Sequence, residues 1–84
     1  MSRKIRIMIV DDHSMVRMGM ASLLAMAPDM EVVAEGEDLE QAVAAFTHHR
    51  PDVTLMDVRM PGGSGLEALA RIRALAPAAR VVIL

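Results

Sequence analysis

The sequence predicts an α/β fold in which helices alternate with the strands of a parallel sheet. Apolar runs without polar alternation indicate strands covered on both faces, as parallel sheets require. Stretches with helical spacing of apolar residues separate these runs, and prolines at positions 28, 51 and 77 mark the helix-to-strand junctions. The order strand, helix, strand, helix, strand, helix, strand is typical of a parallel sheet with right-handed crossovers. With 84 residues, one domain at most is expected.

The first half of the chain supplies two strands and a helix. Residues 5–10 read IRIMIV and form the first predicted strand. A helix is predicted to begin near Ser14, and the apolar residues on one of its faces are Val16, Met20, Leu23, Leu24 and Ala27. The short apolar run 31–34 then predicts the second strand.

The second half repeats this alternation. A helix is predicted from Asp38, whose pairing with Gln41 resembles a capping box, and strand 53–56 follows it. Ser64 and Glu67 fit the S-x-x-E capping box of a third helix. Its apolar positions are Leu66, Leu69, Ile72 and Ala76, and strand 80–84 closes the pattern.

Composition excludes several function classes. Nine Lys and Arg are scattered against eleven Asp and Glu, for a net charge of −2, so no basic patch for DNA or a membrane surface is formed. Phe46 is the only aromatic residue and cysteine is absent, which excludes stacking platforms for nucleic acid, disulfides and thiol chemistry. The apolar run 5–10 is too short for a signal peptide or membrane span, so a cytoplasmic location without a membrane partner is expected.

Three aspartates follow predicted strands at their carboxyl ends. Asp11 and Asp12 come directly after strand 5–10, and Asp57 ends strand 53–56. Because the carboxyl ends of parallel strands lie on one edge, these carboxylates converge if the two strands are neighbours. Such a cluster is unfavourable without a compensating cation. With no cysteine and no well-placed histidine, Mg²⁺ or Mn²⁺ is expected rather than Zn²⁺.

A carboxylate beside such a cation is suited to attack on phosphorus, since the metal offsets repulsion between nucleophile and phosphoryl group. Glycines at 62, 63 and 65 would let backbone amides approach an anion. We therefore predict a phosphoryl-accepting site with Asp57 as the nucleophile.

Two segments, IMIVDDHSMVRMGMASLL and VTLMDVRMPGGSGLEAL, resemble the receiver domain of bacterial two-component response regulators. The start VDDHSMVRMG further resembles the subgroup in which the receiver precedes a LuxR-type helix-turn-helix DNA-binding domain. The resemblance implies a flavodoxin-like, doubly wound parallel sheet with strand order 2-1-3-4-5. It also implies that Asp57 accepts a phosphoryl group from a phosphohistidine of a sensor histidine kinase. Asp12, Asp57 and the backbone carbonyl of Arg59 would ligate Mg²⁺, with Asp11 reaching it through water.

The same resemblance implies at most self-phosphorylation from a phosphodonor and autodephosphorylation, and no metabolic reaction. Residues 1–84 correspond to the N-terminal part of a receiver, so the flavodoxin-like sheet is expected to be incomplete. The hydroxyl residue after the fourth strand, the lysine that ends the fifth strand, the last helices and any DNA-binding effector domain are expected to be absent. DNA would be contacted only through that absent domain.

An incomplete sheet predicts self-association. Strand 80–84 would present an apolar edge, and the methionines of the first helical segment would be partly exposed. We expect a homodimer or a domain-swapped oligomer. These methionines are Met15, Met18, Met20 and Met26.

Other interpretations stay open at this stage. Capping of the first helix is an alternative role for Asp11 and Asp12, although two aspartates in a row after a buried strand favour metal binding. A phosphoaspartyl hydrolase acting on small molecules is a weaker alternative, because position 59 holds arginine instead of a second acid. A receiver-like module that no longer switches and works by dimerisation is another. His13 lies beside the acidic site, where a modulating role is one interpretation and an exposed position at the start of the helix is the favoured one. Arg17, Arg71 and Arg73 are expected to lie on solvated helix faces.

Overall fold

The computed structural model describes residues 3–60 and 63–84. Its parallel sheet has the order β2-β1-β3-β6, which corresponds to the first four positions of the predicted flavodoxin-like order. The strands are β1 (Ile5–Val10), β2 (Met30–Gly36), β3 (Val53–Met56) and β6 (Arg80–Ile83). Central strand β1 therefore pairs with β2 on one side and with β3 on the other.

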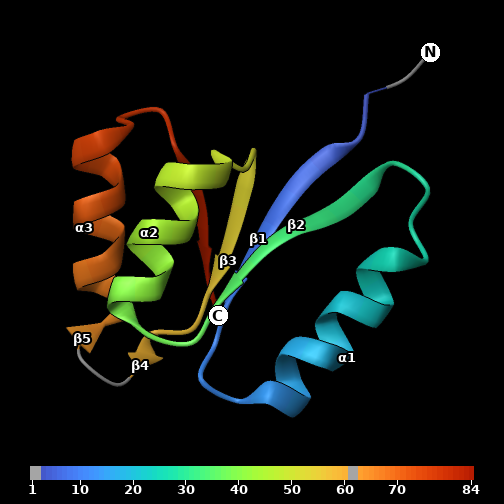
Figure 1. Ribbon diagram of the computed structural model, residues 1–84, viewed down its shortest axis with the longest axis horizontal. Coiled ribbons are helices and arrows are strands. Elements are labelled where there is room, and N and C mark those ends of the chain that lie inside the picture. The colour runs from blue at the N-terminus through green and yellow to red at the C-terminus, as the bar shows by residue number, and fades with distance from the viewer. Residues whose placement is uncertain (1–2, 61–62) are drawn as a thin grey trace.

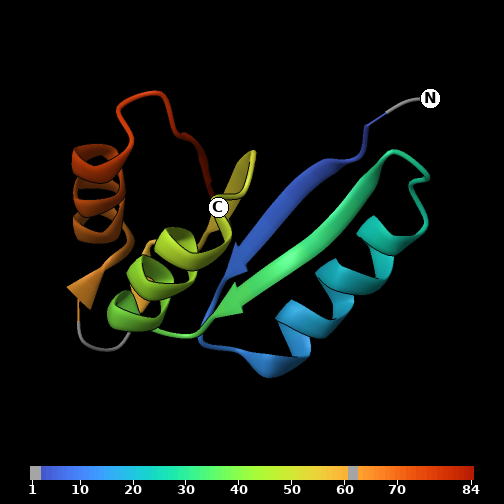
Figure 2. The ribbon, with the colours of Figure 1, turned by 45° about the horizontal axis from the view of Figure 1, so that its top comes forward.

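The helices lie on both faces of this sheet, as in a doubly wound fold. Helix α1 (Ser14–Ala25) covers one face, and α2 (Leu39–His49) and α3 (Gly65–Leu75) cover the other (Figures 1 and 2). Each helix ends before the proline predicted to stop it, at positions 28, 51 and 77. The predicted cap of α2 is confirmed, because the Gln41 backbone N–H donates to Asp38 Oδ1 at 2.8 Å.

The core lies between the sheet and helices α2 and α3. Side chains of β1 and β3 point into it with those of the two helices, among them Phe46 at 3% exposure. Its buried members are Met8, Val10, Leu39, Ala42, Phe46, Met56, Ala68 and Ile72. Alternate residues on these strands point to the same face and pack in the core. Asp11 and Asp57 directly follow these packed strands.

Helix α1 packs more loosely than its apolar spacing predicts. It has no buried residue: Met20 and Leu24 are half-buried, whereas Val16 and Leu23, predicted on the same face, are 46% and 69% exposed. Ala27 lies beyond the end of the helix. Among the described residues α1 packs mainly against β2 and β1, so one side of the helix is covered and the other is exposed.

Two further differences from the prediction concern backbone pairing. Strand β2 extends to both sides of the predicted 31–34, because pairing with β1 includes Met30 and Glu35 whatever their polarity. The segment after Asp57, predicted as a loop, contains the short antiparallel strands β4 (Arg59–Met60) and β5 (Gly63–Ser64). Gly62 and the Ser64 side chain, and with it the predicted Ser64 capping box, lie outside the described part of the chain.

Candidate functional site

The sheet ladder brings the aspartates together at the carboxyl edge. The Asp11 backbone N–H donates to the Gly36 carbonyl at 3.0 Å, and the Asp57 N–H donates to the Val10 carbonyl at 2.8 Å. These bonds continue the pairing of β1 with β2 and of β3 with β1 past the strand ends. Ligand atoms of Asp11, Asp12, Asp57 and His13 all lie within 4.8 Å of one another. The predicted convergence of the three carboxylates is therefore confirmed.

The three carboxylates differ in burial and in their hydrogen bonds. Asp11 is 5% exposed, and its Oδ1 accepts from the His13 backbone N–H at 2.7 Å. Asp57 is half-buried, and its Oδ1 accepts from the Arg59 backbone N–H at 3.0 Å. Asp12 is half-buried, and its Oδ1 is shielded from solvent yet accepts no hydrogen bond among the described residues.

His13 belongs to this cluster, so the expectation of no well-placed histidine was wrong. Its Nδ1 lies 2.8 Å from Asp11 Oδ1 and 2.9 Å from Asp12 Oδ1, although the side chain is 65% exposed. The hydrogen bond with Asp11 raises the pKa of His13 above 6.5, and the charge of Asp12 adds to this effect. The protonated imidazole thus offsets part of the negative charge of the cluster.

The donor set fits a hard divalent cation. Carboxylate oxygens from three side chains suit Mg²⁺ and Mn²⁺. The shielded Asp12 Oδ1 accepts no hydrogen bond among the described residues and lies 2.9 Å from His13 Nδ1, and a cation would satisfy it in place of the histidine. The Asp11 side chain does not cap α1. It accepts from the His13 backbone N–H in a tight turn, and the N-cap residue of α1 is His13, which makes no side-chain cap bond. The role of Asp12 and Asp57 as ligands stays a prediction.

Arg59 and Arg17 flank the cluster in different ways. The exposed Arg59 lies in β4, and its backbone N–H orients the Asp57 carboxylate; ligation by its carbonyl stays a prediction. Arg17 was predicted on a solvated face, and that prediction was wrong: its side chain is 15% exposed, and its guanidinium contacts the backbone of Asp11. The carboxylates of Glu35 and Glu37, which are distant in sequence, hold this side chain, and helical spacing alone does not predict that contact.

Gly65 packs against the backbone of Asp57. A Cβ at this position would meet the Asp57 carbonyl oxygen and lie 2.8 Å from the Val58 Cα, while the Gly65 N–H donates to the Val58 carbonyl at 2.7 Å. The sequence singled this glycine out for approach to an anion. The structure gives it another reason, which is that α3 begins in contact with the backbone of Asp57 and Val58, the two residues that follow β3.

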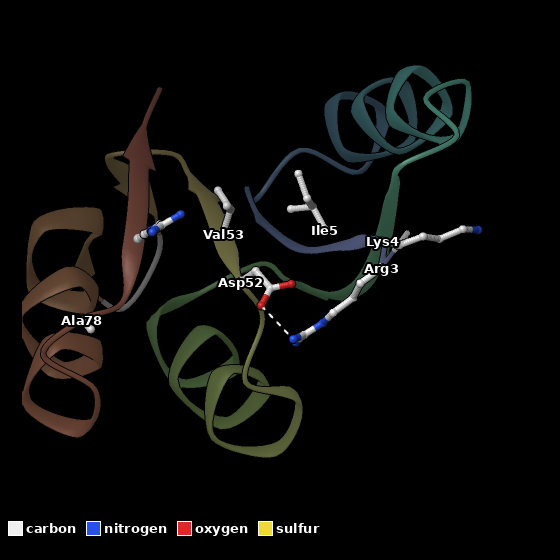
Figure 3. Close-up of a pocket in the computed structure, with 7 residues that line it drawn as sticks. Arg3, Lys4, Ile5, Asp52, Val53 and Ala78 are labelled. Carbon is white, nitrogen blue, oxygen red and sulfur yellow. Dashed lines mark ion pairs between the residues drawn. The ribbon is translucent and has the colours of Figure 1, made fainter. Parts of the chain in front are cut away.

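A cleft also lies at the opposite edge of the sheet. It has a volume of about 440 Å³, lies where β1, β3 and β6 begin, and has Arg3, Lys4, Asp52 and Arg80 among its lining residues. Figure 3 shows Arg3 reaching toward Asp52. Arg3 pairs with Asp52 at 3.7 Å across an exposed surface. Ligands of open parallel sheets bind at the carboxyl ends of the strands, so this cleft is not the candidate site.

Helices within residues 3–60 and 63–84 do not combine the length and apolarity that crossing a membrane requires.

The chain is similar to bacterial signalling proteins. The family described as response regulator receiver domain matches residues 7–84. Transcriptional regulatory protein DegU of Brevibacillus brevis is 46% identical over 81 residues, which are 96% of this chain and 34% of that protein. Nitrate/nitrite response regulator protein NarL of Escherichia coli K12 is 40% identical over 77 residues, covering 92% of this chain and 36% of that protein.

A solved structure supports the same assignment. The crystal structure of a LuxR-family two-component response regulator from Aurantimonas sp. SI85-9A1 superposes with a TM-score of 0.91 at 41% identity, covering 95% of this chain and 57% of that one. The chain spans about a third of the length of the curated relatives it matches. The fold, the family match over nearly the whole chain and the acidic edge of the sheet all point to the same family. The chain belongs to the response regulator receiver domain family, with relatives among LuxR- and NarL-type regulators.

Proposed function

We propose that this receiver accepts a phosphoryl group on Asp57 from a phosphohistidine of a sensor histidine kinase, with Mg²⁺ as the cofactor. The observation that carries the proposal is the convergence of the Asp11, Asp12 and Asp57 carboxylates at the carboxyl edge of the sheet. Family membership supports a role in phosphorelay signalling. The cytoplasm is the expected location for this role.

Asp57 is the proposed acceptor because it follows β3 directly, is less buried than Asp11, and has one carboxylate oxygen oriented by a backbone amide. The Arg59 N–H bound to Asp57 Oδ1 limits rotation of the carboxylate and so presents it in one orientation. In the transfer, a carboxylate oxygen of Asp57 forms the new bond to phosphorus. The P–N bond of the phosphohistidine breaks, and its electron pair stays on the imidazole nitrogen of the kinase.

Asp11, Asp12, Asp57 and the Arg59 carbonyl are the groups proposed to hold Mg²⁺, and Mn²⁺ would suit the same oxygen donors. When bound, the cation offsets the repulsion between the Asp57 carboxylate and the anionic phosphoryl group. His13 competes for the same carboxylate oxygens when it is protonated. Cation binding is therefore expected to displace the His13 side chain from Asp11 and Asp12.

The test is incubation with MgCl₂ and acetyl phosphate, followed by intact mass spectrometry. The expected result is an added mass of one phosphoryl group that is lost in Asp57→Asn. Asp38→Asn is the matched control, since Asp38 caps α2 and asparagine caps equally well. A folded wild-type chain that gains no mass, or an Asp57→Asn variant that still does, contradicts the proposal. Sustained turnover of acetyl phosphate would instead favour the hydrolase alternative.

Transcription regulation is proposed for the longer protein of which such receivers are part. DegU is a transcriptional regulatory protein by name, and this chain matches 34% of its length. We propose that DNA is contacted through an effector domain outside these 84 residues.

A second candidate function is a dimerisation module, and the exposed apolar surface of α1 favours it. Met15, Met18, Leu23 and Met26 are 80%, 65%, 69% and 79% exposed. On the sheet face next to α1, Val82 is 48% exposed. Apolar surface of this kind marks an interaction site, and methionine adapts readily to a partner. Light scattering of the 84-residue chain is expected to give the mass of a homodimer or a swapped oligomer; the mass of one chain at high concentration contradicts this.

A further inference from the structure

The guanidinium of Arg17 joins three parts of the chain beside the acidic cluster. Its Nη1 donates to the Asp11 carbonyl at 2.5 Å, and its Nε donates to Glu35 Oε1 at 3.2 Å. Glu37 Oε2 lies 3.8 Å from the same Nη1. With a side chain only 15% exposed, Arg17 thus links the start of α1 to the carboxyl end of β2 and to the segment between β1 and α1.

The bond to the Asp11 carbonyl controls the geometry of the next residue. That carbonyl belongs to the peptide that joins Asp11 to Asp12, and this peptide is planar. Rotating it would change ψ of Asp11 and φ of Asp12, and would move the Asp12 carboxylate. The Asp11 N–H is already fixed by the Gly36 carbonyl, so Arg17 restrains the remaining freedom of this backbone segment.

We infer that Arg17 is a positioning residue for the cation site: its bridge from Glu35 to the Asp11 carbonyl holds Asp11 and Asp12 in the geometry that binds Mg²⁺. This inference rests on the proposed function. Groups that orient metal ligands without touching the metal commonly contribute about 10- to 100-fold to metal affinity. Arg17 is such a group, because it contacts the backbone of the proposed ligand Asp11 and does not contact its carboxylate oxygens.

Charge alone predicts the opposite result. Arg17 is a cation near the site, and Glu35 and Glu37 are anions beside it. Removing the arginine would make the local potential more negative, which favours a divalent cation. Weaker Mg²⁺ binding without Arg17 therefore indicates positioning, and tighter binding indicates a purely electrostatic role.

The experiment is an MgCl₂ titration of the ¹⁵N-labelled chain, with the Asp12 and Asp57 amide resonances giving the dissociation constant. Arg17→Met keeps much of the apolar stem and removes every donor. Arg71→Met is the matched control, because Arg71 also forms an ion pair with a glutamate, Glu40 at 2.9 Å, but on the α2–α3 side of the sheet. We expect about tenfold weaker Mg²⁺ binding for Arg17→Met and less than a twofold change for Arg71→Met.

Two further variants separate positioning from general stability. Arg17→Lys keeps the charge but cannot span both oxygens as the guanidinium fork does, so only partial recovery of affinity is expected. Glu35→Gln is expected to weaken Mg²⁺ binding in the wild type and to have no further effect in the Arg17→Met background. Urea unfolding of each variant identifies any that fail to fold, and in that case Glu35→Gln, whose site is more exposed, carries the test.

Several results overturn the inference. The inference is wrong if folded Arg17→Met binds Mg²⁺ as tightly as the wild type or more tightly. It is also wrong if Arg71→Met weakens Mg²⁺ binding as much as Arg17→Met does. Additive effects of Glu35→Gln and Arg17→Met also contradict it. Wild-type chain without Mg²⁺-dependent shifts at Asp12 and Asp57 would instead overturn the proposed metal site, and the positioning role with it. The wild-type titration thus distinguishes the two failures.

Discussion

Thr54 carries a hydroxyl in the centre of the sheet that no described residue satisfies, and replacing it should stabilise the fold. The residue lies in β3, where its neighbours across the sheet are Met8 and Val81, and it is 1% exposed. Its Oγ1 is buried without a hydrogen-bond partner among the residues the structure describes. A buried hydroxyl of this kind costs about 1–3 kcal/mol of desolvation.

Thr54→Val exchanges that hydroxyl for a methyl group of nearly the same shape. Taking the lower end of the range, the free energy of unfolding is expected to rise by about 1 kcal/mol. A domain of this size has a urea dependence of about 1 kcal/mol per molar, so the midpoint should rise by roughly 1 M. Urea unfolding followed by far-UV circular dichroism measures this shift.

Thr47→Val is the matched control, because Thr47 is exposed on α2 and its Oγ1 donates to the Val43 carbonyl at 2.8 Å. Its midpoint is expected to stay unchanged or to fall, since a made hydrogen bond is removed. A midpoint for Thr54→Val at or below the wild type would refute the reasoning. It would show that the Thr54 hydroxyl has a partner, such as a buried water, whose bond outweighs the cost of burial.

Two other predictions concern the residues around the acidic cluster. Gly65→Ala should destabilise the chain by about 2 kcal/mol or more, because the new Cβ would collide with the backbone at Asp57 and the neighbour cannot move as a side-chain tip would; an unchanged urea midpoint would show that α3 can start elsewhere. For His13 the pKa, followed by NMR of the metal-free chain, should lie above 6.5 and fall in Asp12→Asn. Because the folded state binds this proton more tightly, the ion pairs with Asp11 and Asp12 stabilise the fold below about pH 6.5, and this contribution is lost as pH rises through the folded pKa. A His13 pKa of 6.5 or lower contradicts the contacts described.

The sequence was sufficient to predict the elements in which local signals and burial agree. Strands β1 and β3 coincide with the predicted 5–10 and 53–56, since buried parallel strands are apolar throughout. Helix α2 starts where Asp38 caps it. The convergence of Asp11, Asp12 and Asp57 also followed, because strand adjacency in a parallel sheet is enough to place residues at one edge.

Contacts between distant segments could not be predicted from spacing. Arg17 reads as a solvated helix residue until β2 brings Glu35 beside it. His13 joins the cluster only because the turn at Asp11 directs its ring back toward both carboxylates. The β4–β5 pair consists of two residues in each strand, which is too short to give any periodicity.

The central place of β1 has a consequence for synthesis of the chain. This strand ends at Val10, but its partner β3 begins at Val53. At about 5–20 residues per second, a ribosome needs roughly 2–8 s to make the intervening segment. During that time IRIMIV can pair with β2 alone, and its other edge remains open to neighbouring nascent chains. The strand that organises the finished sheet is thus also the one most exposed to misassembly while the protein is being made.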